Sequence, residues 1–89
     1  MLYYCLMFRS VTFAQRAARK LENNGIKAMS MRAPYSLSAD GCGYCVKVPE
    51  PGFERAMIVL RETEYAPRKV YRSAGQSGYE EVAERDLPG

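Results

Sequence analysis

Two stretches with helical spacing, each flanked by apolar segments of strand-like composition, constrain the fold of this chain more than any other feature. Both place apolar residues at i, i+3, i+4 and i+7, the pattern of a helix with one buried face. The two sets are Ala14, Ala17, Ala18 and Leu21, and then Phe53, Ala56, Met57 and Leu60. Each set predicts a helix that packs one side against a hydrophobic core.

Residues typical of helix ends flank both stretches. Ser10 or Thr12 can cap the first helix, with Gln15 in the capping-box position after Thr12. Asn24-Gly25 supplies the left-handed residue that ends this helix. The second helix is expected to begin within the proline-containing segment 49–52 and to end near residue 65, before Pro67.

Four short segments around these helices have the composition of β-strands. They are Tyr3–Phe8, Ile26–Ala33, Tyr44–Val48 and Lys69–Arg72. The order β-α-β-β-α-β is that of a ferredoxin-like α+β sandwich, an antiparallel sheet with two helices on one face. A chain of 89 residues, 47% of them apolar, suffices for one such domain, which we place at residues 1–72. Residues 73–89 are expected to form an acidic tail, flexible across 73–78 and helix-like from Tyr79 to Arg85.

A sheet covered by helices on one face leaves its other face open. Tyr3, Cys5 and Met7, or their neighbours, are expected on that open face. Because a core of this size gives marginal stability, self-association through the face would stabilise the domain. The chain is therefore predicted to be a homodimer, formed edge to edge or face to face.

The composition excludes several classes of chemistry. There is no histidine, which rules out Ser/His triads, Cys/His dyads and His-rich metal sites. Residues 1–72 carry twelve Lys and Arg against six Asp and Glu, whereas residues 73–89 carry one against four. The basic body can attract anionic small molecules or acidic surfaces, but it lacks the clustered cations of a dedicated nucleic-acid binder.

The first residues, 1–8, are apolar but have no preceding positive charge and stop at Arg9. We therefore expect neither a signal peptide nor a membrane span, and a cytoplasmic protein. Thiols stay reduced in that compartment, so the three cysteines are expected to be free rather than a disulfide framework.

The segment Asp40-Gly-Cys-Gly-Tyr-Cys45 is the most specific chemical feature of the chain. A redox pair is disfavoured because the cysteines lead into a strand and not a helix N-terminus. A structural zinc site is disfavoured because only Cys5 and a carboxylate could complete it, so no metal or cofactor is expected. The remaining function is an exposed nucleophilic thiol at Cys42, with Cys45 packing into the sheet. In the alternative interpretation both cysteines are packing residues only.

The surroundings of Cys42 favour a thiolate. Gly41 and Gly43 can expose backbone N–H groups that form an anion-binding nest. Lys47, Arg32 and Arg9 are the candidate neighbouring cations, although each is also a typical solvated surface charge. By alternation Cys45 and Lys47 share one face of their strand, and Tyr44, Val46 and Val48 share the other.

RNA binding is a different interpretation of the same fold, since Gly41-Cys-Gly-Tyr44 partly matches the glycine-aromatic run of RNA-recognition motifs. The match fails at three positions, where Asp40, Cys42 and Lys47 replace a cation and two stacking aromatics. Tyr3 or Tyr4 could stack a base, but a tyrosine on a sheet usually packs or forms an interface.

Taken together, the pattern resembles the Se/S carrier protein-like family (domain of unknown function 3343) over residues 3–72. The resembling segments are the strand 4–8 followed by Ser10, the helix end Leu21 with Asn24-Gly25-Ile26, Arg32-Ala33-Pro34 with Leu37-Ser38, and Cys42-Gly43 before a short strand containing Lys47. The resemblance implies that Cys42 carries a terminal sulfur or selenium, received from a donor such as a cysteine desulfurase and passed to a protein acceptor. It also implies an incidental or resolving role for Cys45. A non-catalytic carrier is thus the leading interpretation, and an interaction or ligand-binding module without thiol chemistry is the alternative.

Overall fold

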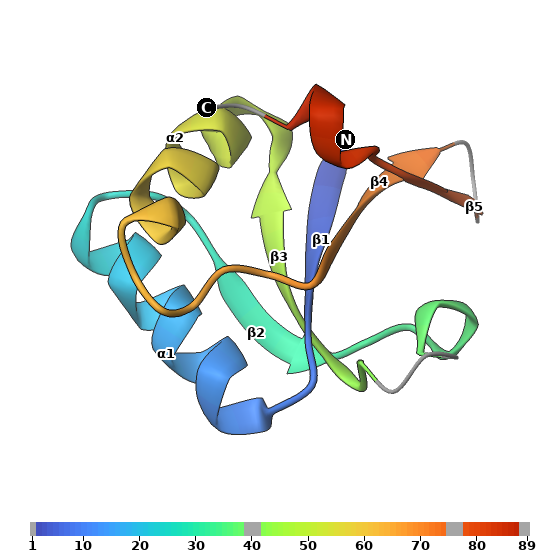
Figure 1. Cartoon of the computed structure of the whole chain (residues 1–89), viewed down its shortest axis with the longest axis horizontal. Coiled ribbons are helices and arrows are strands. Elements are labelled where there is room, and N and C mark those ends of the chain that lie inside the picture. The colour runs from blue at the N-terminus through green and yellow to red at the C-terminus, as the bar shows by residue number, and fades with distance from the viewer. Residues whose placement is uncertain (1, 39–41, 75–77, 88–89) are drawn as a thin grey trace.

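The computed structural model describes residues 2–38, 42–74 and 78–87 (Figure 1). Its elements follow the predicted order, with one strand added at the C-terminal end. They are β1 (Tyr3–Phe8), α1 (Val11–Asn23), β2 (Met29–Arg32), the 3-10 turn η1 (Tyr35–Leu37), β3 (Tyr44–Pro49), α2 (Glu50–Arg61), β4 (Lys69–Ala74), β5 (Gly78–Glu81) and the 3-10 turn η2 (Glu84–Asp86).

The strands form one antiparallel sheet in the order β2-β3-β1-β4-β5. The first four positions are those of a ferredoxin-like sheet, and both helices cover the same face of it (Figure 1). The predicted fold class is therefore confirmed. β1 is central and pairs with β3 on one side and with β4 on the other.

Local sequence sets the ends of α1. Ser10 is the N-cap, and its hydroxyl oxygen accepts a hydrogen bond from the Phe13 N–H at 3.2 Å. Ser10, rather than Thr12, is thus the capping residue. Gly25 follows the helix with φ of +76°, a left-handed conformation that glycine adopts without a steric cost.

The helix α2 ends earlier than the sequence suggests. Its last residue is Arg61, not the predicted position near residue 65. Thr63 accounts for the difference: its hydroxyl donates to the Leu60 carbonyl at 2.8 Å and accepts from the Tyr65 N–H at 3.0 Å. Because this side chain bonds to nearby backbone groups, it favours a turn over continuation of the helix.

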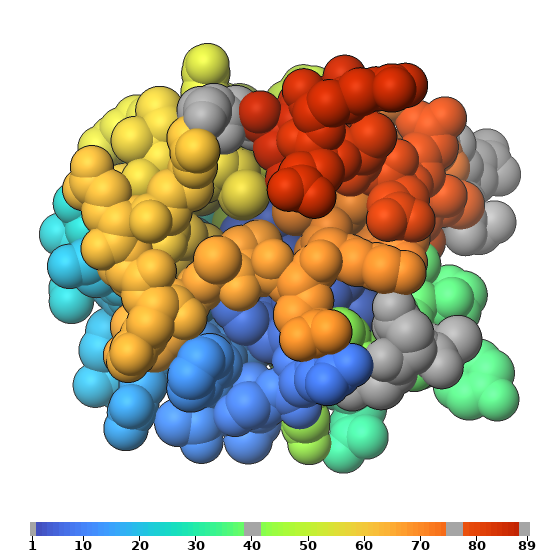
Figure 2. Space-filling model, in the orientation of Figure 1, coloured from blue at the N-terminus to red at the C-terminus, as the bar shows by residue number. Residues whose placement is uncertain are grey.

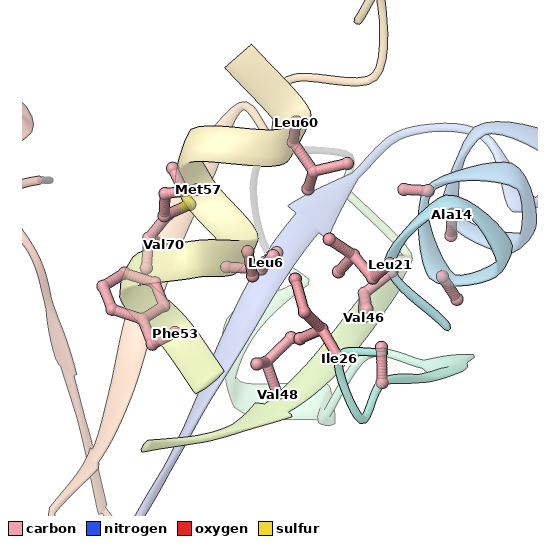
Figure 3. Packing of buried hydrophobic residues seen from close by; sticks show 14 of the residues in the cluster. Leu6, Ala14, Leu21, Ile26, Val46, Val48, Phe53, Met57, Leu60 and Val70 are labelled. Carbon is pink, nitrogen blue, oxygen red and sulfur yellow. The ribbon is translucent and has the colours of Figure 1, made fainter. Parts of the chain in front are cut away.

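The apolar faces of both helices pack on the sheet as predicted (Figure 3). All eight residues of the two helical sets are buried, and they meet Leu6, Val46 and Val48 from the central strands. Ile26 also lies in this core, although β2 begins only at Met29 and is shorter than predicted. The helix side of the sheet therefore holds the main hydrophobic core.

The C-terminal residues differ most from the sequence-based expectation. Residues 78–81, predicted to be flexible or helix-like, form β5 and pair with β4 in antiparallel register. Arg72 and Glu80, which face one another in this pair, form an ion pair at 2.6 Å. Beyond β5 the chain turns through η2 and lies beside α2 (Figure 2). The sheet thus continues beyond residue 72.

A second buried cluster lies on the face of the sheet opposite the helices. It consists of Cys5, Met7, Ala33, Leu37, Cys42 and Cys45, and is called the thiol cluster below. The turn η1 lies on this side of the sheet (Figure 1). Cys5 and Met7, expected on an open face, are only 1% and 0% exposed. The open-face expectation is therefore wrong at these two residues, because the chain's own connections and tyrosines cover them.

Within the described ranges, no helix has both the length and the hydropathy needed to cross a membrane.

Candidate functional site

All three cysteines of the chain belong to the thiol cluster. Each of them is free and buried. Cys5 comes from β1, Cys45 from β3, and Cys42 from the connection that precedes β3. The sequence analysis brought Cys42 and Cys45 together but did not include Cys5 in the site.

Cys5 and Cys45 are in direct contact across the two central strands. In the β1–β3 register Cys5 faces Lys47 and Met7 faces Cys45, so the two cysteines are diagonal neighbours on one face. The interaction of the two side chains lowers the pKa of Cys5 and, together with burial, raises the pKa of Cys45. Of the two thiols, Cys5 is therefore the one that gives up its proton more readily.

Lys47 is the cation nearest this pair. It lies opposite Cys5 in the register, and its charge lowers the pKa of Cys5 further, against the effect of burial. Its Nζ is 4.2 Å from the centroid of the Tyr3 ring, a cation–π distance that holds the ammonium over this face of the sheet. The predicted pairing of Cys45 and Lys47 on one face is confirmed.

Three tyrosines pack around the rim of the thiol cluster. They are Tyr3, Tyr71 and Tyr79. The hydroxyls of Tyr3 and Tyr79 are hydrogen-bonded at 2.8 Å, and their rings meet edge to face with centroids 6.3 Å apart. The hydrogen bond, with partial burial, raises the pKa of Tyr79. Tyr79 was not among the predicted site residues, because its segment was expected to be helix-like.

Cys42 is placed differently from the sequence-based expectation. Its side chain is 1% exposed, so the prediction of a solvent-exposed thiol is wrong. The chain between β2 and β3 packs Ala33 and Leu37 into the same cluster. The Ala33 N–H donates to the Gly43 carbonyl at 3.0 Å and holds the two ends of this connection together. Cys42 is thus enclosed with the other two thiols.

The predicted supports of Cys42 have different outcomes. Gly41 lies outside the described residues. Gly43 has no positive φ, so the alternation of backbone conformations that makes an anion nest is missing at this position. Arg32 lies over the Tyr44 ring at 5.8 Å on the helix side of the sheet, and Arg9 is exposed. Among the described residues, Lys47 is the one candidate cation whose charge shifts the pKa of a cysteine, and it acts on Cys5 and Cys45.

The geometry of this face also bears on RNA binding and on a metal site. The Tyr3 ring, a candidate for stacking a base, already has Lys47 over it and Tyr79 at its edge. Among the described residues there is no group of three or more Cys, Asp or Glu side chains arranged to hold a metal ion.

A surface hollow of about 540 Å³ lies away from the cysteines, between α2, β4 and the C-terminal turn. Its charged lining includes Arg61, Arg68, Glu81 and Glu84, so both signs are present. This mixed lining does not favour one charge of ligand.

A protein-family model described as "Putative Se/S carrier protein-like" matches residues 3–72. Neither the curated proteins nor the solved structures give a match to the chain. The matched range contains all three cysteines and Lys47, and it ends before β5.

Proposed function

The chain belongs to the family described as "Putative Se/S carrier protein-like", and on that premise we propose that it is a non-catalytic carrier that holds sulfur or selenium on the thiol of Cys42. The observation that carries the proposal is the convergence of every thiol of the chain, with Lys47, on one face of the sheet. Packing alone does not require cysteine at all three positions, because small apolar residues fill such sites equally well.

The loading step is a thiol exchange that needs no oxidant. The Cys42 thiolate attacks the outer sulfur of a persulfide on the donor protein, and a new S–S bond forms as the donor's own S–S bond breaks. The donor cysteine leaves as a thiolate, and Cys42 becomes a persulfide. In delivery, a thiolate of the acceptor protein attacks the outer sulfur of the Cys42 persulfide, and Cys42 leaves as a thiolate. A cysteine desulfurase is a donor of the required chemical class.

Access to Cys42 requires a local opening of the chain. Cys42 precedes β3, whereas Cys5 lies in β1, which is hydrogen-bonded to strands on both sides. Segments with fewer backbone hydrogen bonds open at a lower free-energy cost than central strands. Cys42 is therefore the thiol of the cluster that a donor reaches first.

Burial of the closed state suits a carrier. Oxidation of sulfur follows the exposure and thiolate character of the group. A persulfide enclosed with Met7, Ala33 and Leu37 is shielded from dissolved oxidants while Cys42 stays buried. The proposal thus combines transient access with a protected resting state.

A homodimer remains part of this proposal, with the edge of the sheet as its contact. Met29 and Met31 are 62% and 38% exposed on the edge strand β2, and they point to the same side as Cys45 and Lys47. An edge strand with exposed apolar side chains is a pairing surface for a second chain. Sedimentation of the wild type and of Met31→Lys tests this element separately from the carrier role.

The test of the function is the intact mass after incubation of the reduced chain with a cysteine desulfurase and cysteine. We expect a gain of one sulfur that is lost in Cys42→Ser and retained in Cys45→Ser. The folding of each variant is checked by its thermal unfolding midpoint. No adduct on any cysteine of the wild type would contradict the proposal and favour an interaction or ligand-binding module.

A further inference from the structure

The two outer edges of the sheet differ in their charge. At one edge, β5 carries the exposed carboxylates of Glu80 and Glu81, so a second copy pairing there would bring like charges together. At the other edge, β2 carries one charge, at its last residue Arg32. Among the described strands β2 pairs with β3 alone, and its side chains Met29 and Met31 are exposed. The composition of the two edges therefore favours association at β2.

The backbone groups that β2 directs outward follow from its pairing with β3. The Ala33 N–H donates to the Gly43 carbonyl at 3.0 Å, so the backbone of Ala33 faces β3. Because hydrogen-bonded and non-hydrogen-bonded positions alternate along an antiparallel pair, residues 29 and 31 also face β3, whereas Ser30 and Arg32 direct their N–H and C=O groups away from it. Ser30 thus lies in the middle of the free edge.

Resting on the homodimer in the proposed function, we propose that two copies of the chain pair through their β2 strands, antiparallel and about a two-fold axis at Ser30. Each Ser30 exchanges two backbone hydrogen bonds with the partner's Ser30. Each Met29 then lies opposite the partner's Met31 on the face of the thiol cluster. One continuous sheet results from the two copies.

The side chains of β2 favour this register over its neighbours. An axis at Met29 would place each Met31 opposite the partner's Lys27, next to a charge. An axis at Met31 would place each Met29 opposite the partner's Ala33 and leave most of the Met29 side chain uncovered. Only the axis at Ser30, among these three, covers both exposed methionines with a side chain of equal size.

The helix side of the same edge is also complementary to itself. A hollow of about 500 Å³ lies between α1 and β2, and its lining includes Arg19, Glu22 and Ser30. A two-fold axis at Ser30 brings the partner's α1 to this hollow in the antiparallel direction. Arg19 of each copy is then expected to face the partner's Glu22. Opposite charges related by the axis favour the correct register more than they add affinity, because both side chains are exposed.

The pairing joins the two thiol clusters. In the β2–β3 register Met31 lies opposite Cys45, and Met29 lies opposite Lys47. A row of side chains therefore runs across the dimer from Cys45 through Met31 to the partner's Met29. The second copy thus covers the β2 side of each cluster, and both clusters lie on one face of the shared sheet.

The register is tested by disulfide trapping in the full chain. Directly opposite residues of a hydrogen-bonded pair have Cα atoms about 5.5 Å apart, within reach of a disulfide. The two copies of residue 32 would be offset by about 13 Å along the strands, beyond that reach. With oxidised glutathione, Ser30→Cys should therefore form a covalent dimer many-fold faster than Arg32→Cys. The wild type, whose three cysteines are buried, is the control for its own thiols.

The side-chain contacts are tested by sedimentation of the same full chain over a range of concentrations. Met31→Lys should raise the dimer dissociation constant about tenfold, the effect of losing one partly buried methionine contact. Ile58→Lys is the matched control, because Ile58 is 47% exposed on α2 and lies away from β2. Arg19→Glu and Glu22→Arg should each weaken the dimer, and the two changes together should restore it.

A monomeric wild type at every concentration would overturn the proposal. Equal trapping of Ser30→Cys and Arg32→Cys would overturn the register at Ser30, and so would no trapping of Ser30→Cys in a dimeric protein. Equal weakening by Met31→Lys and Ile58→Lys would show that β2 is not the contact. The gain of one sulfur on Cys42 is measured separately by intact mass. A monomer that takes up sulfur would refute the pairing alone, and a dimer that takes up none would refute the carrier role alone.

Discussion

Lys47 lies directly opposite Cys5 in the antiparallel register of β1 and β3, on the face of the sheet that holds no helix. The residue next to it on that face, Cys45, also acts on Cys5 and lowers the pKa of its thiol. One ammonium and one thiol thus act on a single buried sulfur atom. Burial alone would raise the pKa of this thiol, so its lowered pKa comes from these two groups.

Replacing Lys47 with Gln should raise the pKa of Cys5, because the variant removes a positive charge that favours the thiolate. Thiolate absorbance near 240 nm, taken as the difference from the corresponding Cys5→Ser protein, follows the titration. The midpoint should move to higher pH in Lys47→Gln. Lys27→Gln removes an exposed charge and serves as the control. An unchanged midpoint in Lys47→Gln would show that Lys47 does not act on Cys5.

Replacing Tyr79 with Phe should reduce the loss of stability at alkaline pH. The hydrogen bond that the Tyr79 hydroxyl makes with Tyr3 holds the pKa of Tyr79 above its ordinary value of 10.0. The folded chain therefore keeps a proton that the unfolded chain releases. The stability gained from this difference in pKa is complete below the ordinary value of 10.0 and is lost as pH rises through the folded-state pKa of Tyr79.

The measurement for this variant is the urea dependence of unfolding near pH 8 and about pH 11. The fall in the free energy of unfolding between the two should be smaller for Tyr79→Phe than for the wild type. Tyr35→Phe is the matched control, since Tyr35 is 95% exposed. The explanation fails if both variants lose as much stability as the wild type.

Replacing Tyr79 with Ala should make Cys5 more reactive. The ring of Tyr79 packs against the thiol cluster from β5, so its removal uncovers part of the cluster. Alkylation of Cys5 in the native chain, measured on the tryptic peptide 1–9, should become several-fold faster. Tyr79→Phe keeps the ring and should react at nearly the wild-type rate. Equal rates for Ala and Phe would mean that β5 does not shield Cys5.

Replacing Gly43 with Ala should leave the fold almost unchanged. A Cβ built at Gly43 meets no atom within 4 Å, and the residue has no positive φ. Gly25→Ala also has open space but has φ of +76°, so it should cost about 1 kcal/mol. Thermal unfolding compares the two. A larger loss for Gly43→Ala than for Gly25→Ala would contradict this account.

Local patterns predicted the framework of the fold well. The helical spacing identified every buried residue on the sheet-facing sides of α1 and α2. Alternation placed Tyr44, Val46 and Val48 on one face of β3 and Cys45 on the other. These features depend on neighbours a few positions away in the chain. The strand β5 depends on pairing with β4, and residues 78–81 have no strong strand pattern of their own.

The site was predicted only in part, for a similar reason. Cys42, Cys45 and Lys47 were found because they lie close together in sequence. The contact between Cys5 and Cys45 depends on the register of β1 against β3, which a spacing argument does not contain. A ferredoxin-like sheet has its first and third strands side by side, and that was the available signal for Cys5. The burial of Cys42 depends on how residues 33–37 pack, which no local pattern specifies.

Alternate residues of the central strand β1 belong to the main hydrophobic core and to the thiol cluster. In β1 the odd-numbered residues 3, 5 and 7 face the sulfur atoms, and the even-numbered residues 4, 6 and 8 face the helices. Deleting one residue inside β1 ahead of Cys5 would exchange these sides for the rest of the strand, sending Cys5 toward the helices and Leu6 toward Cys45. A single side-chain replacement in β1 can therefore change either the thiol cluster or the main hydrophobic core. A change in the length of β1 would disrupt both at once.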